Sequence, residues 1–173
     1  NVNIALFSMG YSPEHLHGLP VNFKVEINTA GFPRIHIWTN AEPYKRRRGE
    51  KVDNIHTGEH YINLHEVITD NQVKLRADFT KIKRGLHRQL QNGNFDINIG
   101  FMCKQGRHQS ISICRVISEV LMRKGFAVRG PIHLHEGTWL TGHCWRCDKC
   151  DPNYKPKWQL YRIALDLWNS IAV

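Results

Sequence analysis

The sequence predicts an α/β fold in which a mixed, partly parallel sheet is flanked by helices, followed by a small Cys-rich extension and a terminal helix. Three β-prone runs support this class: residues 2–9, residues 97–102, and a run that begins at Phe126. A helical pattern separates the second run from the third. Because a strand, a helix and a strand in that order imply a right-handed crossover, these two strands are expected to form a parallel pair.

The pattern of apolar residues also assigns two segments that precede residue 71. Alternating apolar residues within residues 22–28 predict a half-buried strand, whereas residues 34–60 lack a sustained period and are expected to form a long connection. An amphipathic helix is expected at residues 71–90, ended by Gly93. Its apolar stripe consists of Leu75, Phe79, Ile82, Leu86 and Leu90.

Two more helices are expected in the second half of the chain. The first starts near Ser110, which is expected to be its cap, and ends at Gly125. Its stripe consists of Ile111, Cys114, Ile117, Val120 and Leu121. The second closes the chain and is expected to contact the core or another subunit through one aromatic stripe. That stripe consists of Trp158, Tyr161, Leu165, Trp168 and Ala172.

The loop between the strand at residues 97–102 and the following helix has the features of an anion site. Backbone N–H groups of the loop and of the first helical turn converge where the helix dipole favours negative charge. Ligands of parallel α/β sheets also bind at the carboxyl ends of the strands, where Cys103 is expected. We therefore expect a phosphorylated ligand to contact Cys103, Lys104, Gln105, Gly106, Arg107, His108, Gln109 and Ser110.

A strand ending in cysteine before such a loop is also found in phosphatases that use Cys, five residues and Arg. Here the sixth residue after Cys103 is Gln109, and Arg107 lies two positions too early. The sequence therefore favours binding over catalysis. A phosphate-ester hydrolase that uses Cys103 or His108 is the alternative hypothesis, and a structural subunit of a larger assembly is another.

The same loop resembles that of the C-terminal domain of the RNase adapter protein RapZ family. In that family a strand ending in Gly-Cys precedes Thr/Gly-Gly-Gln-His-Arg-Ser, an amphipathic helix and a Gly-x-x-Val strand. Here Gly106, His108 and Ser110 keep their places, whereas the Gln and Arg that flank the histidine are exchanged. Upstream, residues 7–13 are similar to the family's Phe-Gly-x-x-x-Gly opening.

The resemblance covers roughly residues 2–135. It implies a mixed α/β domain that binds a small regulatory RNA and a phosphorylated amino sugar, glucosamine 6-phosphate, without catalysis of its own. We accordingly expect a RapZ-C-like domain at residues 1–139. Residues 140–173 are expected to form a Cys-rich metal loop and a C-terminal helix packed on that domain.

Three cysteines at Cys-x2-Cys-x2-Cys spacing predict a structural zinc site, because thiolates at this spacing suit tetrahedral Zn²⁺. The fourth ligand must be another residue, and His133 and His135 share one face of the preceding strand. The predicted ligands are Cys144, Cys147, Cys150 and His135. An iron–sulfur cluster and free thiols are the alternatives. Other histidines, His56 and His60 among them, are expected in loops or at the surface.

The charge of the chain favours a polyanionic partner. Lys plus Arg number 24 against 15 Asp plus Glu, a formal net charge of +9. RNA is the expected partner, through Lys45, Arg46, Arg47, Arg48, Lys51, Lys81, Arg84 and Arg88. With no long apolar run, no signal peptide and thiol-type cysteines, we expect no membrane association and a reducing, cytoplasmic setting. A homo-oligomer or a larger assembly is left open.

Overall fold

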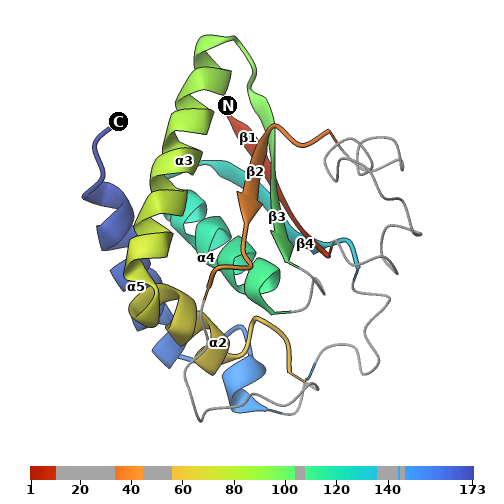
Figure 1. Ribbon diagram of the computed structural model, residues 1–173, viewed down its shortest axis with the longest axis vertical. Helices are drawn as coiled ribbons and strands as arrows, with labels where there is room; N and C mark the ends of the chain where they lie inside the picture. Colours follow the sequence, from red (N-terminus) through yellow and green to blue (C-terminus); the bar gives the residue numbers. More distant parts are fainter. Residues whose placement is uncertain (11–33, 45–55, 104–107, 136–143, 145–146) are drawn as a thin grey trace.

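The computed structural model of the chain describes residues 1–10, 34–44, 56–103, 108–135, 144 and 147–173. Within these residues, four strands form one parallel sheet in the order β2-β3-β1-β4 (Figure 1). The strands are β1 (Asn3–Gly10), β2 (Ile37–Asn40), β3 (Asp96–Cys103) and β4 (Ala127–His133). The predicted α/β class is confirmed.

The strand order differs from the sequence-based expectation in two places. β3 and β4 are parallel as predicted, but β1 lies between them, so that Ile4 pairs with both Ile97 and Val128. β2 lies inside residues 34–60, where a connection was expected, and that prediction was wrong there. A four-residue strand is too short to show a period, and among the described residues β2 pairs with β3 alone. The strand predicted at residues 22–28 lies outside the described residues.

α3 (Gln72–Gln91) and α4 (Gln109–Arg123) cover one face of the sheet, and α5 (Pro156–Asn169) packs on the outside of these two helices (Figure 1). α3 lies against β2, whereas α4 lies against β1, β3 and β4. The terminal helix thus contacts the α/β body as expected. Three short elements complete the described chain: α2 (Tyr61–His65), the π-helical turn η1 (Glu66–Asp70) and the 3₁₀ turn η3 (Asp148–Cys150).

α3 follows its predicted pattern, with Leu75, Phe79, Ile82 and Leu86 buried against the core. Gly85 lets this helix approach the sheet, because a Cβ there would lie 2.8 Å from Cδ1 of Ile37. Gly93 and Gly125 follow α3 and α4 with φ of +78° and +88°, in agreement with their predicted roles at the helix ends.

α4 is buried on nearly all sides, which an amphipathic pattern does not predict. The sheet lies on one side, and α2 and α5 lie against the helix as well. Three serines are therefore buried in addition to the apolar stripe: Ser110, Ser112 and Ser118. Their hydroxyls form hydrogen bonds, such as the one from Ser118 to the carbonyl of Gly130 at 3.3 Å.

The buried face of α5 is shifted from the predicted stripe. Trp158 is 53% exposed and Ala172 is exposed too, so the prediction was wrong for these two residues. The neighbouring helices determine which side of α5 is buried. For example, the ring of Trp168 packs edge-on against Phe79 of α3, with ring centroids 5.2 Å apart. The buried residues are Lys157, Leu160, Tyr161, Ala164 and Trp168.

Candidate metal centre and sheet-edge site

The described residues bring four metal-ligating side chains together. His56, His60, Cys147 and Cys150 place one ligand atom each within 4.8 Å of one another, and we call this group the metal cluster. Nδ1 of His56 lies 3.2 Å from Sγ of Cys150. Imidazole nitrogens and thiol sulfurs are ligands of zinc and other first-row metals. The cluster could therefore hold a metal ion.

Two segments distant in sequence meet at the metal cluster. His60 is the N-cap of α2, where its Nδ1 accepts the N–H of Ile62 at 3.1 Å. Cys147 is the N-cap of η3 and Cys150 is its last residue, and the N–H of Cys150 donates to the carbonyl of Cys147 at 3.0 Å. A turn of this kind brings side chains three residues apart to one side. η3 and α2 contact each other near the lower end of the molecule in Figure 1.

The surroundings of the cluster shift two pKa values in opposite directions. Burial, followed by the neighbouring Cys144 and Cys147, raises the pKa of Cys150 to about 12. Burial, followed by the charges of His56 and nearby lysines, lowers the pKa of His60 to about 4. The Cys150 thiol therefore keeps its proton when no cation is bound, and metal binding would release it.

The structure does not bring all four predicted metal ligands together. Cys147 and Cys150 belong to the metal cluster, whereas Cys144 is not one of its four members, although its thiol helps to raise the pKa of Cys150. His135 lies at the carboxyl end of the sheet, where its Nδ1 accepts the N–H of Gly10 at 2.7 Å. The structure thus brings together two of the predicted cysteines and two histidines that were not predicted as ligands.

His56 and His60 were missed because each was treated as a loop residue. His60 does lie in the loop that precedes α2, but it is buried there, with only 5% of the residue exposed. The sequence did contain a signal, because a His-x3-His pair beside Cys-x2-Cys spacing is typical of zinc sites. Spacing alone could not choose this pair among the eleven histidines of the chain.

Residues 56–60 connect the metal cluster to the start of α4. Nε2 of His108 lies 3.2 Å from the carbonyl oxygen of His56, and the Ser112 hydroxyl donates to the carbonyl of Gly58 at 2.6 Å. Gly58 allows this approach, because a Cβ there would lie 2.0 Å from the His108 oxygen. The position of residues 56–60 is therefore coupled to the first turns of α4.

The described part of the predicted phosphate loop lies at the carboxyl edge of the sheet. Cys103 is the last residue of β3, and its thiol donates to the hydroxyl of Ser110 at 3.1 Å. α4 begins at Gln109 with His108 as its N-cap, so the prediction that Ser110 caps the helix was wrong. Ser110 lies two residues after the N-cap, inside the first turn, and its hydroxyl accepts the hydrogen bond from Cys103. Lys104, Gln105, Gly106 and Arg107 lie outside the described residues.

A half-buried polar network extends from residues 56–60 across the same edge. Nε of Arg115 donates to Oε1 of Glu59 at 2.8 Å, and Nε2 of His133 lies 3.7 Å from that oxygen. Although burial opposes the change, hydrogen bonding to His133 and the charge of Arg115 lower the pKa of Glu59 to about 2. The charges of this network are thus paired within the fold.

Part of this network has the residue types of a nucleophilic triad. Oγ of Ser8 and Nδ1 of His133 are 2.6 Å apart, and Glu59 faces the other ring nitrogen. However, Ser8 is only 1% exposed, and the Glu59 carboxylate also receives the hydrogen bond from Arg115. We therefore interpret these contacts as structural.

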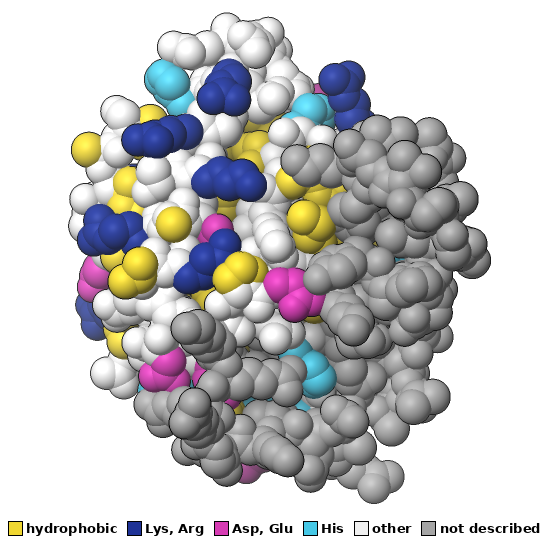
Figure 2. Space-filling model, viewed as in Figure 1, with side chains coloured by type: hydrophobic (Ala, Val, Ile, Leu, Met, Phe, Trp, Pro, Cys, Tyr) yellow, Lys and Arg dark blue, Asp and Glu magenta, His cyan; other side chains and the backbone are white. Residues whose placement is uncertain are grey.

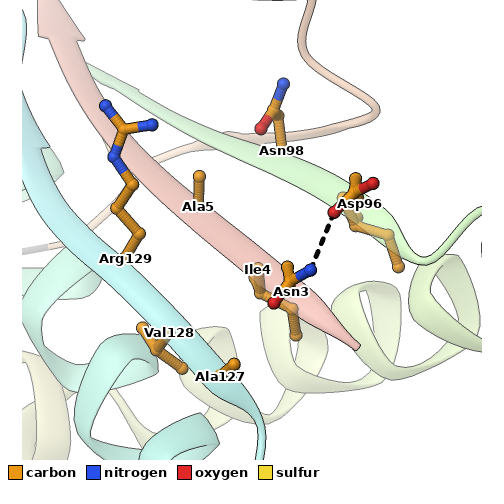
Figure 3. Close-up of a pocket in the computed structure, with 9 residues that line it drawn as sticks. Asn3, Ile4, Ala5, Asp96, Asn98, Ala127, Val128 and Arg129 are labelled. Atoms are coloured by element: carbon orange, nitrogen blue, oxygen red, sulfur yellow. Dashed lines mark hydrogen bonds between the residues drawn. The ribbon is translucent and has the colours of Figure 1, made fainter. Parts of the chain in front are cut away.

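The opposite, amino-terminal end of the sheet carries a shallow groove of about 460 Å³ (Figure 3). Asn3, Asp96, Asn98 and Arg129 are among its lining residues, and Nδ2 of Asn3 donates to Oδ1 of Asp96 at 2.9 Å. Because the strands are parallel, this groove and Cys103 lie at opposite ends of the sheet. The groove is therefore separate from the predicted phosphate loop.

Part of the predicted RNA surface lies on α3. Lys81, Arg84 and Arg88 are exposed on this helix, and Figure 2 shows Lys and Arg side chains along the same side of the molecule. Lys83 has another role, since its ammonium donates to two backbone carbonyls at the C-terminal end of α5, at 2.6 and 2.8 Å. Lys45, Arg46, Arg47, Arg48 and Lys51 lie outside the described residues.

In the part of the chain that the structure describes, no helix combines the length and the apolar character needed to cross a membrane. The chain matches no protein-family model, and no curated protein matches it either.

Proposed function

We propose that this chain is a RapZ-C-like, zinc-stapled α/β domain that binds a phosphorylated ligand at residues 103–110 and RNA through its basic surface. One observation carries the proposal: residues 56–60 supply half of the metal cluster and also bond directly to His108 and Ser112 of the predicted loop and helix. A metal held at the cluster would therefore stabilise the edge of the sheet at which ligands of α/β domains bind.

The donor set of the metal cluster supports zinc. Zn²⁺ prefers four N and S ligands at about 2.0–2.3 Å, and four ligand atoms within 4.8 Å of one another need only small shifts to surround it. Four protein ligands leave no open position for a substrate, which is typical of structural zinc. In that role the ion would join η3, and hence the start of α5, to residues 56–60.

The positions of Cys103 and of the start of α4 support an anionic ligand. α4 begins at the carboxyl edge of the sheet, and the N–H groups of a first helical turn and the helix dipole attract negative charge. Gly106, His108 and Ser110 match the RapZ-like motif. By that resemblance we expect a phosphorylated amino sugar such as glucosamine 6-phosphate.

Binding is favoured over phosphate-ester hydrolysis by the surroundings of Cys103. A nucleophilic cysteine needs access to the substrate and an environment that stabilises its thiolate. Cys103 is only 2% exposed, and its thiol acts as a donor to Ser110. This arrangement fits a structural residue that packs against the first turn of α4.

RNA binding is supported by charge. Three exposed cations of α3, Lys81, Arg84 and Arg88, lie on a chain whose formal net charge is +9. Such contacts neutralise phosphates without reading bases, so we expect the affinity to fall as salt is added.

Isothermal titration calorimetry tests the proposal by measuring the affinity of the metal-loaded protein for glucosamine 6-phosphate. We expect His108→Ala to weaken binding at least tenfold, as expected when a charge-assisted hydrogen bond is lost. Arg129→Ala, which removes a cation from the separate groove, should leave the affinity unchanged, and unphosphorylated glucosamine should not bind. Equal affinities of the wild-type protein and His108→Ala would contradict the proposed site.

A further inference from the structure

Two thiols of the metal cluster lie in one short turn. Cys147 and Cys150 are three residues apart in η3 and its N-cap, so the turn brings both side chains to one side. Their Sγ atoms lie within 4.8 Å of each other, and both cysteines are free. A disulfide needs an S–S distance of about 2.05 Å. Because both residues belong to the same turn, a rearrangement within that turn can close the remaining gap.

The two thiols differ in their access to solvent. Cys147 is partly exposed, whereas only 8% of Cys150 is exposed. An oxidant from solvent therefore reaches Cys147 first, and Cys150 lies beside it as the thiol that can react with the oxidised sulfur. Cys103 and Cys114 present no such accessible thiol, because both are buried in the hydrophobic core.

The same two sulfurs are half of the donor set for the metal. Cysteine binds a metal ion as the thiolate, and a disulfide has no thiolate left. Oxidation would leave His56 and His60 as the remaining members of the metal cluster, and two imidazoles do not complete the four-coordinate site that structural zinc requires. A bound metal ion and a disulfide between Cys147 and Cys150 therefore exclude each other.

We infer that Cys147 and Cys150 form a redox-sensitive dithiol, which peroxides oxidise to a disulfide with release of the metal ion. The inference rests on the metal site of the proposed function and adds a way to regulate it. It concerns sulfur chemistry of the metal cluster and is independent of the ligand bound at the sheet edge.

The oxidation takes place in two steps. The Cys147 thiolate attacks one oxygen of hydrogen peroxide, so that an S–O bond forms, the O–O bond breaks and hydroxide leaves. The Cys150 thiolate then attacks the sulfenic sulfur, so that the S–S bond forms, the S–O bond breaks and a second hydroxide leaves. The two sulfurs lose two electrons, the peroxide gains them, and both hydroxides take up protons from solvent to give water.

Release of the ion would remove a link between segments that are distant in sequence. η3 precedes α5 and contacts α2, whereas residues 56–60 bond to His108 and Ser112 at the start of α4. Without the metal, only these packing contacts and hydrogen bonds would hold η3 near the sheet edge. Oxidation should therefore lower the stability of this region and leave the hydrophobic core unchanged.

Treatment of the zinc-loaded full chain with hydrogen peroxide tests the inference. A chromogenic chelator measures the released Zn²⁺, and peptide mass mapping identifies the disulfide. We expect one Zn²⁺ to be released for every two thiols lost, a linkage between Cys147 and Cys150, and recovery of zinc binding after reduction with dithiothreitol. Cys114→Ala removes a core thiol outside the metal cluster, so this matched control should behave like the wild-type protein. Cys144→Ser should give the same linkage.

The outcomes separate this inference from the proposed function. If the zinc-loaded protein keeps its Zn²⁺ in peroxide, or releases it with no linkage between Cys147 and Cys150, the redox inference is wrong while the metal site stands. A disulfide that disappears in Cys144→Ser would also contradict the inferred pair. If the wild-type protein binds no Zn²⁺, the metal site of the proposed function is wrong, and the inference with it.

Discussion

The helix-covered face of the sheet and its carboxyl edge are held together by different forces. On the covered face, side chains such as Phe79, Ile99 and Ile117 are completely buried, and their stabilisation depends on the apolar area removed from water. At the carboxyl edge, Glu59 and Arg115 are held by directional bonds. On the covered face, the stability lost in a substitution should therefore depend on the volume that is removed. At the carboxyl edge, adding or removing a single atom or group should already lower the stability.

The largest loss of stability is expected on the covered face. Phe79 is completely buried and meets the ring of Trp168, so Phe79→Ala leaves a cavity and should lower the free energy of unfolding by about 3–5 kcal/mol. Urea denaturation measures this difference. It should be the same with and without a chelator, because Phe79 packs in the core and is not a member of the metal cluster. A loss that depended on the metal would mean that the two regions unfold together.

A smaller but more local loss is expected from one methyl group at the carboxyl edge. Gly58→Ala places a Cβ 2.0 Å from the carbonyl oxygen of His108, and the overlap should cost about 3 kcal/mol, at the upper end for overpacking. Gly93→Ala is the matched control, because nothing lies within 4 Å of its added Cβ and only the left-handed φ of +78° is strained, by about 1 kcal/mol. The difference in unfolding free energy between the variants would be absent if residues 56–60 did not lie against α4.

The smallest loss of stability is expected from the buried hydrogen bond between Tyr44 and Asp78. The Tyr44 hydroxyl donates to Oδ2 of Asp78 at 2.7 Å, and burial, followed by the charge of Asp78, raises the pKa of Tyr44 above its usual value of 10.0. The unfolded chain ionises this tyrosine near pH 10 whereas the folded chain does not, so its contribution is complete below that pH and is lost as the pH rises. Tyr44→Phe should cost about 1 kcal/mol at neutral pH and reduce the alkaline loss of stability. Denaturation at neutral pH and above pH 10 measures both, and equal alkaline losses in both proteins would argue against this pair.

Long periodic segments were the parts of the fold that could be predicted. The expected helix at residues 71–90 corresponds to α3 (Gln72–Gln91), and the run at residues 97–102 to β3 (Asp96–Cys103). β2 and α2 were not predicted, because elements of four and five residues show no resolvable period. The phase of α5 also escaped prediction, since Lys157 is buried while Trp158 is exposed.

The candidate metal site also has one part that could be predicted from the sequence and one part that could not. Cys147 and Cys150 could be chosen from their spacing, because that spacing is local in the chain. His56 and His60 reach these cysteines only because α2 and η3 pack against each other.

By itself, the sequence determined the α/β class, the main helices, the basic charge and the presence of soft metal ligands, since each depends on composition or on neighbours along the chain. Only the tertiary structure decided the order of the strands, the histidines of the metal cluster and the contact of residues 56–60 with α4. Those features depend on which distant segments share a surface, and this is a result of packing that no short window of residues contains.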